Sequence, residues 1–175
     1  IQHNSGNQVI VLHQLGNHGP AYHARYPKEF EKYQPACNTS DLSKCSQQEI
    51  INAYDNSVRY TDAFLSKTID QLRKHTDKST SLIYMSDHGE SLGENGIYLH
   101  GLPYSIAPKQ QTQVPFFMWL SDNYKIDHPK LEDCVAEESK KPAHHDNLFH
   151  TVLGMFDIKT SIYDRRFDLT ERCHG

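Results

Sequence analysis

The sequence predicts an α/β fold with a mostly parallel central sheet flanked by helices. Three short apolar runs, at residues 9–12, 81–85 and 114–120, read as strands. They are continuously apolar rather than alternating, which is typical of strands covered on both faces. A long amphipathic pattern lies between the first two runs, and the order strand, helix, strand favours parallel pairing.

The strongest helix signal begins at Ser46. Ser46 and Glu49 have the spacing of a capping box, in which each residue satisfies a backbone donor of the other. We expect a long helix from there to about Lys74, with one apolar face formed by Ile50, Tyr54, Val58, Thr61, Leu65, Ile69 and Leu72. Residues 146–156 predict a second helix, and the polar residues 121–142 predict irregular structure.

Composition excludes some classes of function. The 175 residues suffice for one domain, and 22 acidic against 18 basic residues give a net charge of −4. Such a surface does not suit nucleic acid, which requires a clustered basic face. The longest apolar run, residues 114–120, is far shorter than a membrane-spanning helix, and residues 1–7 lack the features of a signal peptide. We expect a fragment whose membrane anchor or export signal lies upstream.

Four cysteines bear on the cellular compartment. Cys37 and Cys45 bracket a short polar loop, a spacing that favours a local disulfide and hence an oxidising compartment. The alternative is two reduced surface thiols. Cys134 and Cys173 pair either with each other or with residues outside the chain, and the sequence leaves both possibilities open.

Metal-ligand residue types stand at two predicted strand ends, where functional groups of parallel sheets collect. Asp87 and His88 follow the strand at 81–85, and His13 ends the strand at 9–12. Carboxylate oxygen and imidazole nitrogen are both good zinc ligands, and Gly89 breaks the strand so that adjacent side chains can reach one ion. The alternative for this pair is a hydrogen-bonded aspartate beside a surface histidine.

A longer pattern surrounds these residues. Residues 86–101, with residues 12–20, 52–56 and 145–150, form a set in which the chain resembles the lipid A phosphoethanolamine transferases, including the mobilised colistin-resistance enzymes. That family belongs to the alkaline-phosphatase-like superfamily. The resemblance implies an alkaline-phosphatase/sulfatase-like fold. It implies that residues 1–175 are the C-terminal portion of a periplasmic catalytic domain, held at the bacterial inner membrane by a missing N-terminal segment.

The resemblance also implies roles for individual residues. Zinc would be held by Asp87 and His88, together with a glutamate and a nucleophilic threonine that lie upstream, so this chain contains no nucleophile. His18 and His100 match catalytic histidines that bind the phosphate or a second metal, and His13 is a possible further site residue. The loop between Cys37 and Cys45 matches a family disulfide.

The implied reaction takes phosphoethanolamine from phosphatidylethanolamine to a lipid A phosphate through a phospho-threonine intermediate, a modification associated with polymyxin resistance. The nearest alternatives are a phosphoglycerol transferase, a core-sugar or glucan phosphoethanolamine transferase, and a sulfatase. An alternative of another class is a non-catalytic zinc-binding module. Glu90 and Glu94 either support the metal ligands or serve as ordinary capping or exposed residues.

Overall fold

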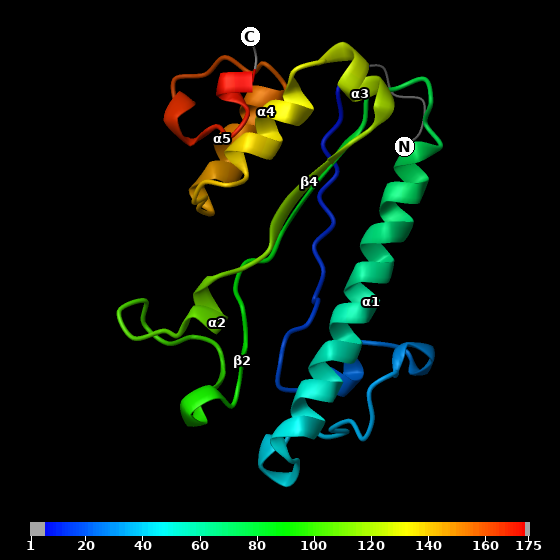
Figure 1. Ribbon diagram of the computed structural model, residues 1–175, viewed down its shortest axis with the longest axis vertical. Coiled ribbons are helices and arrows are strands. Elements are labelled where there is room, and N and C mark those ends of the chain that lie inside the picture. The colour runs from blue at the N-terminus through cyan, green and yellow to red at the C-terminus, as the bar shows by residue number, and fades with distance from the viewer. Residues whose placement is uncertain (1–5, 174–175) are drawn as a thin grey trace. The chain divides into compact units, whose positions relative to one another are not determined.

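Residues 6–173 are described by a computed structural model (Figure 1), so most of the segment 1–7 lies outside the described residues. The described chain forms two packing units. One contains residues 13–74 and 82–119, and the other contains residues 6–12, 75–81 and 120–173. The candidate site residues at positions 13, 18, 87, 88 and 100 all belong to the first unit.

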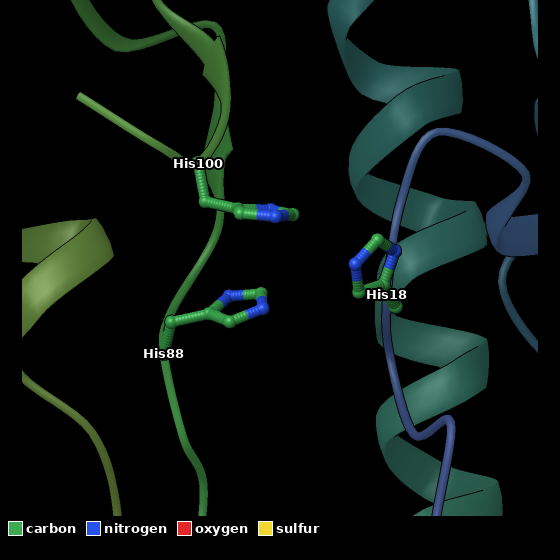
Figure 2. Close-up of side chains that lie close together, drawn as sticks. All are labelled: His18, His88 and His100. Atoms are coloured by element: carbon green, nitrogen blue, oxygen red, sulfur yellow. The ribbon is translucent and has the colours of Figure 1, made fainter.

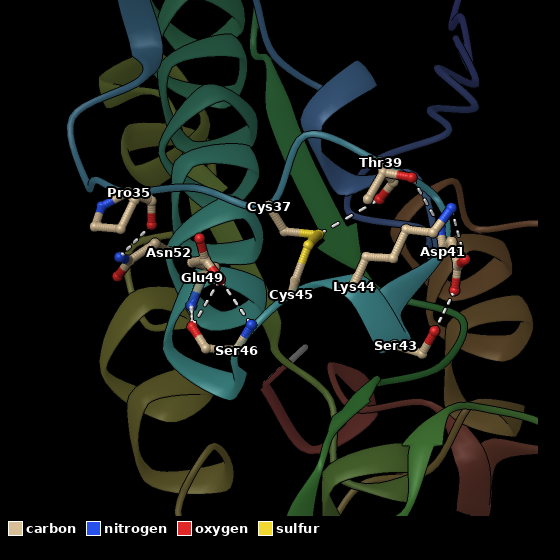
Figure 3. Close-up of a disulfide and its surroundings, with 10 residues drawn as sticks. All are labelled: Pro35, Cys37, Thr39, Asp41, Ser43, Lys44, Cys45, Ser46, Glu49 and Asn52. Atoms are coloured by element: carbon tan, nitrogen blue, oxygen red, sulfur yellow. Dashed lines mark hydrogen bonds and ion pairs between the residues drawn. A yellow bond between two sulfur atoms is a disulfide. The ribbon is translucent and has the colours of Figure 1, made fainter.

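The long helix α1 (Gln47–Arg73) starts and ends where the sequence predicts. The Glu49 N–H donates to Ser46 Oγ at 3.3 Å, and the Ser46 N–H donates to Glu49 Oε2 at 2.7 Å, which confirms the capping box (Figure 3). Its last turn carries Arg73, a cation that suits the negative end of the helix dipole.

The buried face of α1 differs from the predicted apolar stripe. Val58 is 42% exposed, whereas Asn56 and Ser57 are fully buried. Asn56 Oδ1 accepts from the N–H groups of Lys32 and Tyr33 at 2.8 and 2.9 Å, and its Nδ2 donates to the Tyr33 carbonyl at 2.9 Å. Because these bonds satisfy the amide of Asn56, this polar side chain is stable in the interior. They also attach the loop around Lys32 and Tyr33 to α1.

The strands form two antiparallel pairs. In the small pair, β2 (Ser91–Leu92) and β3 (Tyr98–Leu99) are antiparallel. In the other, β1 (Ser81–Met85) lies beside β4 (Phe116–Leu120). The Ser121 N–H donates to the Thr80 carbonyl at one end of this pair, and the Ser86 N–H donates to the Pro115 carbonyl at the other. This register is antiparallel (Figure 1).

This orientation differs from the parallel pairing that the sequence predicts for these two strands. A parallel pair requires a connection that crosses back over the sheet, usually through a helix of several turns. Here the chain between β1 and β4 contains only the β2–β3 hairpin and the four-residue helix α2 (Lys109–Thr112), and it re-enters the sheet from the end at which it left.

The predicted strand at residues 9–12 is wrong for the described structure. These residues belong to no strand, and their side chains are 55% to 81% exposed. A strand exists only where a neighbouring backbone satisfies its N–H and C=O groups, and an apolar run does not by itself provide that neighbour. No such neighbour pairs with residues 9–12 within the described part of the chain.

The prediction of irregular structure for residues 121–142 is also wrong, since two helices lie there, α3 (Asp122–Asp127) and α4 (Leu131–Glu138). Ser121 caps α3 by accepting from the Tyr124 N–H, and Leu131 in α4 is 1% exposed. Helix α5 (Asp146–Met155) confirms the predicted second helix. Short 3-10 turns occupy Tyr22–Ala24, Lys28–Phe30, Leu42–Lys44, Glu94–Gly96, Arg165–Phe167 and Glu171–Cys173.

Two disulfides are present. The Cys37–Cys45 bond confirms the expected local pairing (Figure 3), and Cys134 bonds to Cys173, the pairing that the sequence left open. Cys37 packs in a small core with Tyr22, Ile50 and Ala53, which joins the residue 19–45 loop to the first turns of α1. Among the described helices, none has both the length and the apolar character needed to cross a membrane.

Candidate metal centre

Three histidines from distant parts of the sequence converge in the first unit. His18 lies in the loop before the Tyr22 turn, His88 follows β1, and His100 follows β3. Each offers a ring nitrogen, and these three atoms lie within 4.8 Å of one another. Figure 2 shows the rings of His88 and His100 side by side, facing His18 on a separate segment. We call this group the histidine triad.

Hydrogen bonds determine which nitrogen each ring of the triad presents. Nδ1 of His18 lies 2.7 Å from the Gly19 carbonyl oxygen, and Nδ1 of His88 lies 3.0 Å from the Gly89 carbonyl oxygen. Nδ1 of His100 lies 3.0 Å from a carboxylate oxygen of Glu90. Carbonyl and carboxylate oxygens only accept, so each Nδ1 carries the proton and each neutral ring keeps a lone pair on Nε2. This is the arrangement typical of histidines that bind a metal.

The packing of the rings supports the same interpretation. His88 and His100 are stacked, with centroids 3.8 Å apart and an interplanar angle of 27°. His18 meets them edge-on, at 5.5 Å from His88 and 4.8 Å from His100. The three rings are therefore packed closely enough to act on one ligand together.

Glu90 links the segments that carry the triad. Its side chain is 4% exposed, and Oε1 accepts from the Gly19 N–H and from His100 Nδ1, both at 3.0 Å. Its Oε2 accepts from the Tyr22 hydroxyl at 3.1 Å. Burial, together with the negative charge of Glu90, raises the pKa of Tyr22, so the phenol remains a donor. One buried carboxylate therefore fixes both the loop after His18 and the ring of His100.

The backbone around His100 is unusual on both sides. Leu99 has φ +63° and Gly101 has φ +99°. A bulky residue in the left-handed region is uncommon and costs on the order of 1–3 kcal/mol. The pairing of Leu99 with Ser91 and the packing of its side chain against the core hold this conformation in place. His100 therefore lies at a bend between two residues with positive φ.

Side chains of helix α1 position the loop that carries His18. Asn17 donates from Nδ2 to Ser57 Oγ at 2.8 Å and accepts at Oδ1 from Thr61 Oγ1 at 3.2 Å. Arg25 Nε donates to the His18 carbonyl at 2.8 Å. The buried hydroxyls of Ser57 and Thr61 on α1 therefore hold the loop that carries His18.

The structure unites some predicted site residues and leaves others apart. His18, His88 and His100 form the triad. The Asp87 side chain is 84% exposed, and its Oδ2 lies 4.0 Å from His88 Nε2, so it borders the triad without joining it. His13 is exposed and lies outside the triad. Sequence reasoning left Glu90 undecided, and only its three donors reveal that it organises the site.

Glu90→Gln is expected to weaken zinc binding by roughly 10- to 100-fold, the range for a residue that orients a metal ligand. Glutamine retains one acceptor oxygen, but its amide NH₂ group would face a donor that Glu90 now satisfies. A competition titration with a zinc chelator measures the effect. The matched control is Glu94→Gln, because the Glu94 carboxylate accepts from the Leu92 N–H at 2.8 Å. Equal zinc affinity in both variants would contradict the orienting role.

Comparisons with known proteins find relatives among the phosphoethanolamine transferases. "Phosphoethanolamine transferase EptA" of Salmonella typhimurium is 47% identical over 175 residues, which are 99% of this chain and 32% of that protein. The soluble domain of lipooligosaccharide phosphoethanolamine transferase A from Neisseria meningitidis superposes with a TM-score of 0.88 at 40% identity. The superposed part covers 94% of this chain and 50% of the Neisseria meningitidis domain.

The C-terminal periplasmic domain of phosphoethanolamine transferase EptC from Campylobacter jejuni superposes with a TM-score of 0.81 at 49% identity, covering 88% of this chain and 48% of that one. The chain thus spans about a third of the length of the curated relatives it matches and about half of these solved domains. These superpositions confirm the predicted alkaline-phosphatase/sulfatase-like fold. The Sulfatase family model matches residues 1–158, and the chain belongs to the Sulfatase family.

Proposed function

We propose that this chain supplies the histidine-bearing part of a zinc-dependent phosphoethanolamine transferase. The observation that carries the proposal is the triad, in which each Nδ1 contacts a carbonyl or carboxylate oxygen and one ring nitrogen of each histidine lies within 4.8 Å of the others. The similarity to phosphoethanolamine transferases over 99% of the chain favours this chemistry over that of a sulfatase or a phosphoglycerol transferase.

The proposed donor is phosphatidylethanolamine and the proposed acceptor is a lipid A phosphate. In the first step a threonine oxygen outside this chain attacks phosphorus, and the bond from phosphorus to the diacylglycerol oxygen breaks as that oxygen takes a proton. In the second step a lipid A phosphate oxygen attacks the phosphorus of the phosphoethanolamine-threonine ester, and the bond from phosphorus to the threonine oxygen breaks as that oxygen takes a proton. The lipooligosaccharide enzyme among the structural neighbours supports a lipid acceptor.

His88 is the proposed zinc ligand of this chain, with Asp87 beside it. Asp87 is exposed, so a different side-chain rotamer would be needed to bring its carboxylate to an ion on His88. Bound zinc neutralises phosphoryl charge and lowers the pKa of a coordinated hydroxyl. His18 and His100 face the same point and bind either phosphoryl oxygens or a second ion.

We assign the chain to the C-terminal portion of a periplasmic catalytic domain at the inner membrane. The periplasmic domain from Campylobacter jejuni supports this location, and the two disulfides suit an oxidising compartment. The proposal places the glutamate ligand and the threonine in the part of the catalytic domain outside this chain, and any membrane anchor in a separate segment of the full-length protein.

Mass spectrometry of lipid A from cells that express the full-length parent tests the proposal. We expect a phosphoethanolamine adduct with the parent and with His13→Ala, and none with His88→Ala. If phosphoethanolamine were found only on core sugar or glucan, the proposed lipid A acceptor would be wrong and that sugar would be the acceptor. Absence of any adduct from a well-expressed parent that still binds zinc would favour the non-catalytic zinc-binding module.

A further inference from the structure

The loop that follows His100 carries three exposed apolar side chains. In residues 102–106, here called the apolar loop, Leu102 is 37%, Tyr104 is 85% and Ile106 is 65% exposed. Single exposed apolar residues are common on soluble proteins. Three of them within five residues, beginning two residues after a member of the triad, form a local concentration that requires an explanation.

The apolar loop is anchored at its base and folded at its tip. The Leu102 N–H donates to Gln111 Oε1 at 3.4 Å, and Gln111 in turn donates from Nε2 to the buried Ser91 Oγ at 3.0 Å. At the tip, the N–H groups of Ile106 and Ala107 both donate to the Pro103 carbonyl at 2.9 Å. Hydrogen bonds therefore hold the backbone of the loop at both places, while Tyr104 and Ile106 stay exposed in this chain.

The charge of the surrounding sequence indicates the kind of partner. The chain has 22 acidic residues, yet none lies in residues 95 to 121, and Lys109 is the single Lys or Arg of that stretch. A segment free of carboxylates avoids repulsion from an anionic surface, and a lysine beside it adds attraction. Tyrosine combines an apolar ring with a polar hydroxyl, which suits the boundary between lipid headgroups and acyl chains.

From these observations we propose that the apolar loop docks on an anionic phospholipid surface, with Tyr104 and Ile106 inserted below the headgroups and Lys109 at their level. The inference rests on the proposed function, because a transferase that takes a headgroup from a phospholipid must bring its site to the membrane surface. Shallow insertion of a few apolar side chains reaches about 5–10 Å into the interface. His100, at the base of the loop, would then lie at the level of the headgroups.

A fluorescence experiment on the 175-residue chain tests the docking. Trp119 is the single tryptophan, so Trp119→Phe provides a silent background in which Tyr104→Trp introduces one reporter. Vesicles of phosphatidylethanolamine and phosphatidylglycerol with brominated acyl chains should shift its emission to the blue and quench it. The matched control is Ile126→Trp in the same background, because Ile126 is 74% exposed in α3 and lies outside the apolar loop.

A second pair of variants measures the binding itself. Replacing both Tyr104 and Ile106 with serine should lower the vesicle partition coefficient roughly tenfold or more, because two apolar side chains lose their burial. Replacing both Ile126 and Ile162 with serine should leave the vesicle partition coefficient unchanged. These two residues are 74% and 64% exposed. Equal loss in both pairs, or equal quenching at positions 104 and 126, would mean general stickiness and would overturn the proposal.

The remaining outcomes separate this inference from the proposed function. If the reporter at position 104 stays in water while the chain binds zinc, the docking fails and the transferase assignment stands. If the reporter is already shielded from aqueous acrylamide in the full-length parent without lipid, another part of the protein covers the loop and the docking is wrong. Quenching by lipid in a protein that transfers no phosphoethanolamine would instead retain the docking and remove the assigned activity.

Discussion

His88→Ala should abolish the stabilisation of this chain by zinc. His88 stacks on His100 and contributes one ring nitrogen to the triad, so its removal takes away a ligand and a packing partner together. We expect zinc affinity to fall by more than about 100-fold, beyond the range for outer partners of a metal ligand. Asp87 alone cannot compensate, because an exposed carboxylate is a weak ligand without the ring beside it.

Thermal unfolding with and without zinc measures this effect. A ligand present at about 100 times its Kd stabilises a protein by about 2.7 kcal/mol, and a chelator should remove that increment from the unsubstituted chain. His88→Ala should unfold at the same temperature with zinc and with chelator. His13→Ala serves as the control, since His13 is exposed outside the triad and should leave the zinc response intact. A full zinc response in His88→Ala would exclude the triad as the metal centre.

Gly89→Ala should disrupt the same site through the backbone. A Cβ at this position would lie 2.0 Å from the carbonyl oxygen of Gln110 and 3.0 Å from its carbonyl carbon. Both are backbone atoms, so neither can rotate away. The Gly89 N–H also donates to the Gln111 carbonyl at 3.0 Å, which couples the turn after His88 to the segment around residue 111.

Overpacking of this kind costs about 1–3 kcal/mol, and here relief of the clash moves the carbonyl that holds His88 Nδ1. We therefore expect both a lower unfolding temperature and at least a tenfold loss of zinc affinity. Gly96→Ala is the matched control. Its Cβ meets nothing within 4 Å, although φ +75° adds backbone strain, so it should lower stability without changing zinc affinity. If Gly89→Ala bound zinc normally, the close approach to Gln110 would have no role in the site.

Local features were predictable where local chemistry decides them. The capping box at Ser46 and Glu49 fixed the start of α1, and the apolar runs located β1 and β4. The spacing of Cys37 and Cys45 led to the correct disulfide. The histidines of the triad were identified one by one, by their strand-end positions and by resemblance to a family, before any distance between them was known.

Pairing of distant segments was not predictable in this way. The direction of β4 relative to β1 depends on how the connection between them folds. Residues 9–12 have the composition of a strand, but their sequence does not show whether a neighbouring strand is present to pair with them. The predicted buried face of α1 is wrong at Val58, which is exposed, whereas Asn56 is buried. The sequence of α1 does not show this, because the loop that forms hydrogen bonds with Asn56 comes from another part of the chain.

By itself, then, the sequence determined the long helix and the strand-end placement of His88, and its resemblance to a family led us to expect zinc. Only the tertiary structure decided that Glu90 gathers Gly19, Tyr22 and His100 around one carboxylate. It likewise decided that ring nitrogens of His18, His88 and His100 lie close together while Asp87 and His13 remain outside. The physical reason is that a hydrogen bond or a metal site requires atoms to lie within a few ångströms, and sequence spacing does not fix that separation across a chain.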